Sequence, residues 1–241
     1  FFIKNRYEKK DSEIEYSLLE NGIDSLKKAK VNIKEFEKYP EELSYHFLKD
    51  AIIFLNHGIE ILLKYILSER HESLIFTDIN LYMDAKEKLK NESKSKRKPF
   101  GINYKLNVFD VELGNNNKKK SLHTINLKET IKRIKLLLDI DISKDVDSAI
   151  ILINNYRNHI THHSISLDDE NVKELVEKLK FLYSHILYFF QEHIKETNIV
   201  SKVDAERYLL TKKEWEEYQR DLEEFYHDRA MSDISLDSDE V

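Results

Sequence analysis

The residues best suited to chemistry lie in one short stretch, residues 156–163, with the sequence Tyr-Arg-Asn-His-Ile-Thr-His-His. Arg157 keeps its positive charge and presents a planar guanidinium group that fits phosphate oxygens. Histidine is the side chain that gains or loses a proton near neutral pH, and the stretch contains His159, His162 and His163. These residue types are therefore suited to reactions of phosphodiesters.

An amphipathic helix is predicted to position this stretch. Ser143 is a suitable N-cap, and the apolar stripe that follows consists of Val146, Ile150, Ile153, Tyr156 and Ile160. Because a helix turns about 100° per residue, Arg157 and His162 lie roughly 140° apart on it. We therefore expect the helix to end or distort near Thr161, where freer side chains can approach one another.

Two other interpretations of the stretch stay open. In the first, Arg157 pairs with an acidic neighbour while the three histidines stabilise the negative end of the helix dipole, and spacing alone favours this. In the second, His159 and His163 share a helix face and, with His162, offer three imidazoles to a metal ion. The metal interpretation is the weakest, because no Glu follows the first His and Arg157 repels a divalent cation.

The pattern Arg-Asn-x-x-x-His resembles the signature of the HEPN superfamily, in which Arg precedes a polar residue and a His four to six residues beyond the Arg. Residues 54–64, Phe-Leu-Asn-His-Gly-Ile-Glu-Ile-Leu-Leu-Lys, are also similar to the long early helix of these proteins. The resemblance covers residues 12–196. It implies three catalytic residues, Arg157, Asn158 and His162, and His163 also falls within the tolerated spacing.

The resemblance implies a metal-independent endoribonuclease that acts on RNA without a cofactor, of the toxin or anti-phage defence type. His162 would activate the ribose 2′-OH or protonate the leaving 5′-oxygen, Arg157 would stabilise charge on the phosphate, and Asn158 would orient the groups. It also implies a homodimer whose two motifs form one composite site, and an antitoxin or defence-system protein as partner. HEPN toxins silenced by a nucleotidyltransferase have a Tyr two residues after the His, where this chain has Ser164.

The composition indicates an all-α protein. Of 241 residues, 41% are hydrophobic, and four Gly and two Pro are too few for an all-β chain or a glycine-rich Rossmann fold. We expect a HEPN-like bundle of about four to five helices. The domain is expected to span residues 1–200, with an insertion over about residues 70–125 that has room for a short β-hairpin. An acidic, partly disordered extension is expected over residues 201–241.

Two early helices are expected to form the core. Residues 12–37 have near-helical apolar spacing, with Gly22 as a mild interruption. Residues 43–69 carry two adjacent apolar stripes, so this helix should be buried on two sides, one of them against a partner chain. Gly58 suggests a close approach of another backbone. The remaining narrow face is interpreted as an exposed ion-pair row rather than a site, and it consists of Asn56, Glu60 and Lys64.

The rest of the chain gives weaker local signals. Residues 102–113 alternate in polarity, which predicts a bulged strand that pairs with residues 121–125. Asn126 and Glu129 form a capping box, and Asp168 is the predicted cap of the last long helix. No apolar run approaches the roughly 20 residues of a membrane span, no signal-peptide pattern opens the chain, and Cys is absent. A cytoplasmic protein without a membrane partner is expected.

Charge is unevenly distributed in a chain whose net charge is −6. Residues 86–120 contain eleven Lys or Arg and four acidic residues, whereas residues 221–241 contain eight acidic residues and one Arg. The basic segment suits an RNA backbone and equally suits a solvated loop. Two alternatives to the ribonuclease follow: a non-catalytic module that binds RNA or nucleotide through the basic segment, and a structural helical dimer that docks another protein through its acidic tail.

Overall fold

The structure is a computed structural model that describes residues 17–38, 44–92, 106–115, 118–195, 198–203 and 220. Contacts divide the chain into two units, Phe1–Ile199 and Val200–Val241. Apart from residues 200–203 and Arg220, the second unit lies outside the described residues. The predicted acidic extension, residues 201–241, belongs to this unit, so most of it also lies outside the described residues. The described part of the first unit is mostly helical and has one two-stranded sheet, which confirms the all-α class.

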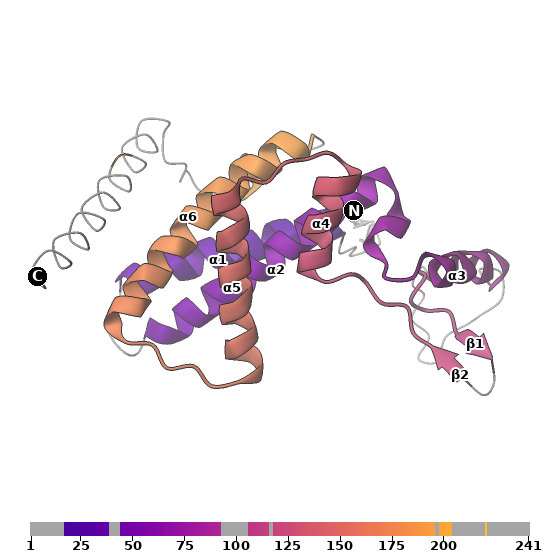
Figure 1. The fold of residues 1–241 in the computed structure, drawn as a ribbon, viewed down its shortest axis with the longest axis horizontal. Coiled ribbons are helices and arrows are strands. Elements are labelled where there is room, and N and C mark those ends of the chain that lie inside the picture. The colour runs from indigo at the N-terminus through magenta and orange to yellow at the C-terminus, as the bar shows by residue number, and fades with distance from the viewer. Residues whose placement is uncertain are drawn as a thin grey trace, which may run out of the picture. The chain divides into compact units, whose positions relative to one another are not determined.

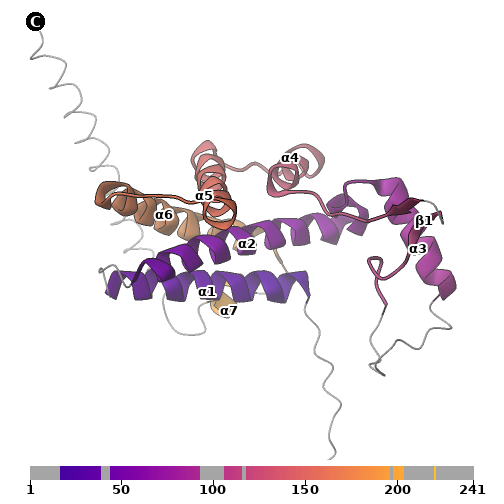
Figure 2. The same ribbon diagram turned by 90° about the horizontal axis from the view of Figure 1, so that it is seen from below.

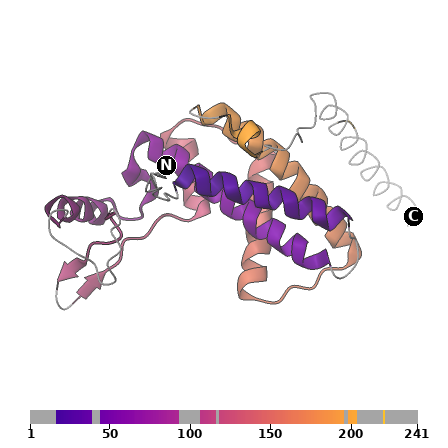
Figure 3. The same cartoon turned by 180° about the vertical axis from the view of Figure 1, so that it is seen from behind.

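A helical bundle forms the body of the first unit. Its helices are α1 (Leu18–Lys38), α2 (Tyr45–Arg70), α4 (Leu127–Leu137), α5 (Lys144–His162) and α6 (Asp169–His193). Helices α1 and α2 run antiparallel and side by side, which Figures 2 and 3 show from two directions. Helices α4, α5 and α6 pack on α2, and α4 and α5 lie on the side of α2 opposite α1 (Figures 1 and 2). The short helix α7 (Ile199–Val203) follows α6.

Helix α2 is the core helix, as its two apolar stripes predict. Most of the described side chains of both stripes are buried, and the most deeply buried apolar residues of α2 are Ala51, Ile52, Leu55, Ile59, Leu62, Leu63 and Leu67. Because α1 covers one side of α2 and α4, α5 and α6 contact it from elsewhere, the chain itself buries both sides. The two apolar stripes of α2 are therefore no evidence for a partner chain, although the sequence analysis expected a partner to cover one of them.

Two glycines allow α1 and α2 to approach closely. A Cβ atom at Gly58 would lie 3.2 Å from the carbonyl oxygen of Gly22 and 2.8 Å from Cδ2 of Leu26. A Cβ atom at Gly22 would lie 2.5 Å from Cγ of Leu62. The predicted backbone approach at Gly58 is thus confirmed. Gly22 faces Gly58 where α1 and α2 cross, so it serves the same close approach instead of merely interrupting α1.

Helix α2 also corrects the expectation that no segment is long and apolar enough to cross a membrane. By length and composition α2 meets that test, and 61% of its most apolar window is buried within the protein. A core helix of a bundle passes the same test, because both environments select apolar residues. The burial of α2 under its neighbours is the pattern of such a core helix.

The segment between α2 and α4 is more ordered than its sequence suggested. It contains the 3₁₀ helix η2 (Glu72–Ile75), helix α3 (Ile79–Glu92) and strands β1 (Leu113–Asn115) and β2 (Lys118–Lys120). Helix α3 was not predicted. It begins where the carboxylate of Asp78 accepts the N–H of Leu81 at 3.0 Å, and Leu81, Tyr82 and Ala85 form its buried face. Tyr82 donates a 2.8 Å hydrogen bond to Glu72, which ties α3 to η2.

The hairpin was predicted with the wrong strands. Strand β1 pairs antiparallel with β2, with Gly114 opposite Lys119, instead of with residues 121–125. Residues 106–112 form a turn rather than a strand, because the side chain of Asn107 accepts the N–H of Phe109 at 2.8 Å and Asp110 accepts the N–H of Asn107 at 2.8 Å. The start of the predicted strand, residues 102–105, lies outside the described residues.

The predicted helix caps are confirmed. In each case a side-chain oxygen accepts the backbone N–H of the residue three positions later. Asn126 accepts from Glu129 at 2.9 Å, Ser143 accepts from Val146 at 3.4 Å, and Asp168 accepts from Asn171 at 2.8 Å. These caps fix the starts of α4, α5 and α6. The start of α5 in turn determines that the Arg-Asn-x-x-x-His motif lies in its last turns.

Candidate functional site

The motif occupies the C-terminal end of α5. The helix ends at His162, and His163 continues in an extended conformation, with φ −140° and ψ 176°. The helical pattern is regular up to this end, since the N–H of His163 bonds to the carbonyl of His159 at 2.8 Å and the hydroxyl of Thr161 bonds to the carbonyl of Arg157 at 2.8 Å. The helix therefore ends within one residue of Thr161, as one of the two expectations had it, and it is not distorted before that end.

Arg157 and Asn158 are brought together by a direct hydrogen bond. The guanidinium of Arg157 donates from Nη1 to Oδ1 of Asn158 at 3.0 Å, and both side chains are partly buried. On a helix Asn158 lies about 100° from Arg157 and only about 40° from His162. The hydrogen bond therefore inclines the guanidinium toward the helix face that carries His162, although within one chain Arg157 and His162 do not share a face.

Arg157 has no acidic partner within the part of the chain that the structure describes, so the ion pair that spacing alone favoured is not formed there. Arg has five N–H donors, and one is used by Asn158. The remaining donors can bind an oxyanion.

The three histidines of the motif are exposed. His159, His162 and His163 all lie at the solvent-facing end of α5, and the ring centroids of His159 and His163 are 6.1 Å apart. Within the described ranges, no group of three or more His, Cys, Asp or Glu side chains is arranged to hold a metal ion. Exposed imidazoles at a helix end can exchange protons with a bound substrate.

His57 on α2 is a neighbour of Arg157 that the sequence analysis did not single out. Partial burial lowers the pKa of His57, Glu60 acts in the opposite direction, and the charges of Arg157 and Lys64 lower it further. His57 is therefore mainly neutral at pH 7. The signal was present in the sequence, since His57, Glu60 and Lys64 follow one another at helical spacing on one face of α2.

The polar row on α2 contains the expected ion pair between Glu60 and Lys64, but the row is not exposed: Asn56 and Lys64 are buried, and the Glu60 side chain is 24% exposed. The ammonium of Lys64 lies 2.6 Å from the carboxylate of Glu60 and donates to the hydroxyl of Thr124 at 3.2 Å, and its side chain is 7% exposed. The residues before α4, including Thr124, cover this part of α2. Asn56 is also buried, and its Oδ1 atom has no hydrogen-bond partner within the described part of the chain.

The basic segment is described only in part. Strand β2 carries Lys118, Lys119 and Lys120, and the last two are exposed. Lys88 of α3 donates to the carbonyl of Glu112 at 3.0 Å, which joins α3 to the hairpin. Residues 93–105, with the cluster Lys-Ser-Lys-Arg-Lys, lie outside the described residues. The described lysines of the hairpin are available to solvent and to an anionic partner.

Comparisons with protein-family models, with curated proteins and with solved structures give no match to this chain. The resemblance to the HEPN superfamily thus stays an expectation drawn from the sequence.

Proposed function

We propose that the protein is a metal-independent endoribonuclease of HEPN type, acting as a toxin or anti-phage defence effector in the cytoplasm. The observation that carries the proposal is an arginine that has no acidic partner among the described residues and is hydrogen-bonded to Asn158 at 3.0 Å, in the last turns of the helix that ends at the exposed His162. An unneutralised guanidinium is a binding group for phosphate, and an exposed imidazole is a proton donor and acceptor. Cleavage of an RNA phosphodiester by the adjacent ribose 2′-hydroxyl requires a phosphate-binding cation and a group that transfers protons, and these two side chains can supply them.

In the proposed reaction, the ribose 2′-oxygen attacks the adjacent phosphorus and the bond from phosphorus to the 5′-oxygen breaks. One imidazole removes the proton of the 2′-hydroxyl, and another protonates the leaving 5′-oxygen. Arg157 stabilises the negative charge that develops on the phosphate oxygens, and Asn158 holds the guanidinium in place. The products are a 2′,3′-cyclic phosphate and a 5′-hydroxyl, so atoms and charge balance without a cofactor.

A second copy of the chain would supply the second imidazole. Ile151, Asn155, Asn158 and His162 follow one another on a single stripe of α5, and Ile151 is 50% exposed. Leu136 and Leu137 at the end of α4 are also exposed, at 66% and 55%. An exposed apolar residue on the stripe that carries His162, together with exposed leucines elsewhere on the bundle, supports a homodimer in which two such stripes meet and form a composite site.

The test is cleavage of single-stranded RNA by the purified dimer. Replacement of His162 or Arg157 by Ala should each lower the rate by about a hundredfold or more, as is usual for a general acid or base and for a donor to developing charge. His159→Ala is the matched control, because His159 is exposed at the same helix end and lies outside the motif. His163→Ala decides which of the two adjacent histidines is catalytic. Cleavage should persist in chelator, and a 2′-deoxyribose at the cut site should block it.

Two results would contradict the proposal. One is wild-type dimer that leaves a broad set of RNAs intact. The other is cleavage that is unchanged by His162→Ala and by His163→Ala. A monomer in sedimentation at micromolar concentration would count against the composite site but not against RNA binding.

A non-catalytic RNA-binding module is the second candidate, and the exposed lysines of β2 favour it. Lys119 is 85% exposed and its nearest acidic partner, Glu112, is 3.8 Å away and equally exposed, so this pair leaves the lysine largely free. Loss of RNA binding on replacement of Lys119 and Lys120 by Ala, with no cleavage seen for the wild-type protein, would establish this alternative.

A further inference from the structure

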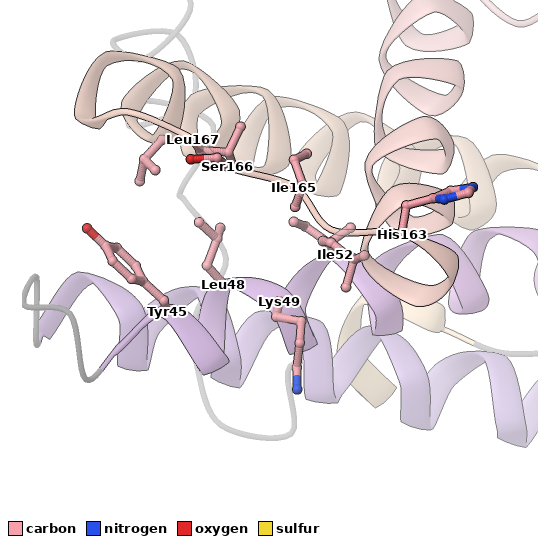
Figure 4. A pocket seen from close by; sticks show the side chains of 10 residues that line it. Tyr45, Leu48, Lys49, Ile52, His163, Ile165, Ser166 and Leu167 are labelled. Carbon is pink, nitrogen blue, oxygen red and sulfur yellow. The ribbon is translucent and has the colours of Figure 1, made fainter.

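A hollow of about 450 Å³ adjoins the end of α5. It lies between the N-terminal part of α2 and the extended segment that joins α5 to α6 (Figure 4). Its floor and walls are apolar, formed by Leu48, Ile52, Ile160, Ile165, Leu167 and Val172. Leu48 and Ile52 rise from α2 toward Ile165 and Leu167 in Figure 4. The volume is in the range of small-molecule sites.

The rim of the hollow is aromatic and polar. Tyr45 stands at one end, 43% exposed, with its ring stacked on Phe36 of α1 at a centroid distance of 6.4 Å. Ser166 lies along the rim, and His163 lies at the other end, next to the motif. Lys49 also borders the hollow, but its ammonium points away from it in Figure 4 and lies 3.7 Å from Asp50. The rim contains no acidic residue. An apolar slot with such a rim fits a flat, uncharged ring attached to an anionic backbone.

We propose that the hollow binds one unpaired base of the RNA, the base beside the phosphate held at Arg157. The inference rests on the proposed ribonuclease function and names a subsite of that site. Recognition of single-stranded RNA commonly places a splayed base in an apolar slot against an aromatic ring, while cations hold the backbone. Tyr45 offers the ring, and Ser166 offers a hydroxyl to the base edge.

Position and charge favour RNA over an apolar peptide as the occupant. His163 borders the hollow and directly follows His162, so the slot is continuous with the proposed catalytic end of α5. Ile160 lines the hollow and lies three residues after Arg157, whose guanidinium has no acidic partner among the described residues. A nucleotide can place its base in the apolar slot and its phosphate at Arg157, whereas an apolar side chain satisfies the slot alone.

The experiment measures binding separately from cleavage. Short 2′-O-methyl homopolymers of each base lack the attacking hydroxyl, so they bind without being cut, and an abasic strand of equal charge is the reference. Ser166→Trp places a large ring in the slot from an exposed position. Ser164→Trp is the matched control, since Ser164 is exposed on the same segment and does not line the hollow. Circular dichroism verifies that both variants are folded.

We expect at least one homopolymer to bind roughly tenfold or more tightly than the abasic strand, as base stacking normally provides. Ser166→Trp should remove this difference and Ser164→Trp should keep it. Equal affinity for abasic and base-bearing strands, or a difference that survives Ser166→Trp, overturns the subsite even if RNA is cleaved. Base-dependent binding that Ser166→Trp abolishes in a protein that never cleaves RNA would retain the subsite and reject the ribonuclease.

Discussion

Two polar clusters of this protein carry similar residues in opposite situations. On α2, the cation of Lys64 is buried, lies 2.6 Å from Glu60 and also bonds to Thr124. At the end of α5, the cation of Arg157 is partly exposed and is hydrogen-bonded to a neutral amide, Asn158. The first cluster has its charge satisfied within the fold. The second retains donors for a ligand.

The difference teaches that the partner of a charged residue, more than its type, separates a structural role from a chemical one. Glu60 and Lys64 are both on α2, and the hydrogen bond from Lys64 to Thr124 joins α2 to the segment before α4. Removal of one partner of a buried ion pair leaves an uncompensated charge. An exposed cation without a counterion contributes little to folding and is free to bind phosphate. On this view, mutations on α2 should change stability and mutations at the end of α5 should change activity.

The largest effect is expected on stability from Glu60→Ala. Without its carboxylate partner, the buried ammonium of Lys64 is left with Thr124, which should lower the free energy of unfolding by about 3 kcal/mol. The matched control is Glu35→Ala. Glu35 lies 2.6 Å from Lys38, and the two glutamates are similarly exposed, at 29% and 24%, whereas the Lys38 side chain is 59% exposed and that of Lys64 is 7% exposed. The control should change the free energy of unfolding by less than about 1 kcal/mol.

Urea unfolding of both variants measures the contrast. If Glu60→Ala and Glu35→Ala are equally mild, the Lys64 pair is not a structural anchor and the division of roles between the two clusters is wrong.

A smaller effect is expected when Arg157 receives a carboxylate. Asn158→Asp preserves the shape of the side chain and the oxygen that accepts from Arg157, but it adds a negative charge to the phosphate-binding group. The rate of RNA cleavage should fall by about tenfold or more, because the new ion pair competes with phosphate. Stability should change by less than about 1 kcal/mol, since the pair is near the surface.

Asn155→Asp is the control for this substitution, because Asn155 is exposed about one turn earlier on the same stripe of α5. It adds the same charge away from the guanidinium. Equal losses of activity in both variants would mean that general repulsion of RNA, rather than occupation of Arg157, is responsible.

Much of the bundle could be predicted because its signals are local. Helix α2 follows from two apolar stripes, and the caps at Asn126, Ser143 and Asp168 follow from residue type and spacing. Helix α3 could not, because its buried residues Leu81, Tyr82 and Ala85 are surrounded by Lys, Asp and Asn, and its stability comes from packing on η2 and the hairpin.

The candidate site divides in the same way. Arg157 and Asn158 are neighbours in sequence, so their contact could be predicted from the motif. His57 approaches Arg157 from α2, a hundred residues earlier, and only the packing of α2 against α5 brings them together. The buried state of Lys64 was missed for the same reason, since the cover that includes Thr124 is distant in sequence.

The smallest expected effect is on the pH dependence of stability, and it involves the residue between the two clusters. The pKa of His57 is lowered in the folded protein from its ordinary value of 6.5, first by burial and, against the pull of Glu60, by Arg157 and Lys64. The unfolded chain therefore binds a proton at a higher pH than the folded chain does. Stability is full above 6.5 and decreases as the pH falls below it toward the folded pKa.

His57→Gln should reduce this loss of stability at acid pH. His185→Gln should reduce the loss independently, because burial also lowers the pKa of His185, against the opposing effects of the Phe181 carbonyl and Asp145. Urea unfolding at a series of pH values, for the two single variants and the double variant, measures the slope. An unchanged slope in all three would show that neither histidine is held neutral by the fold.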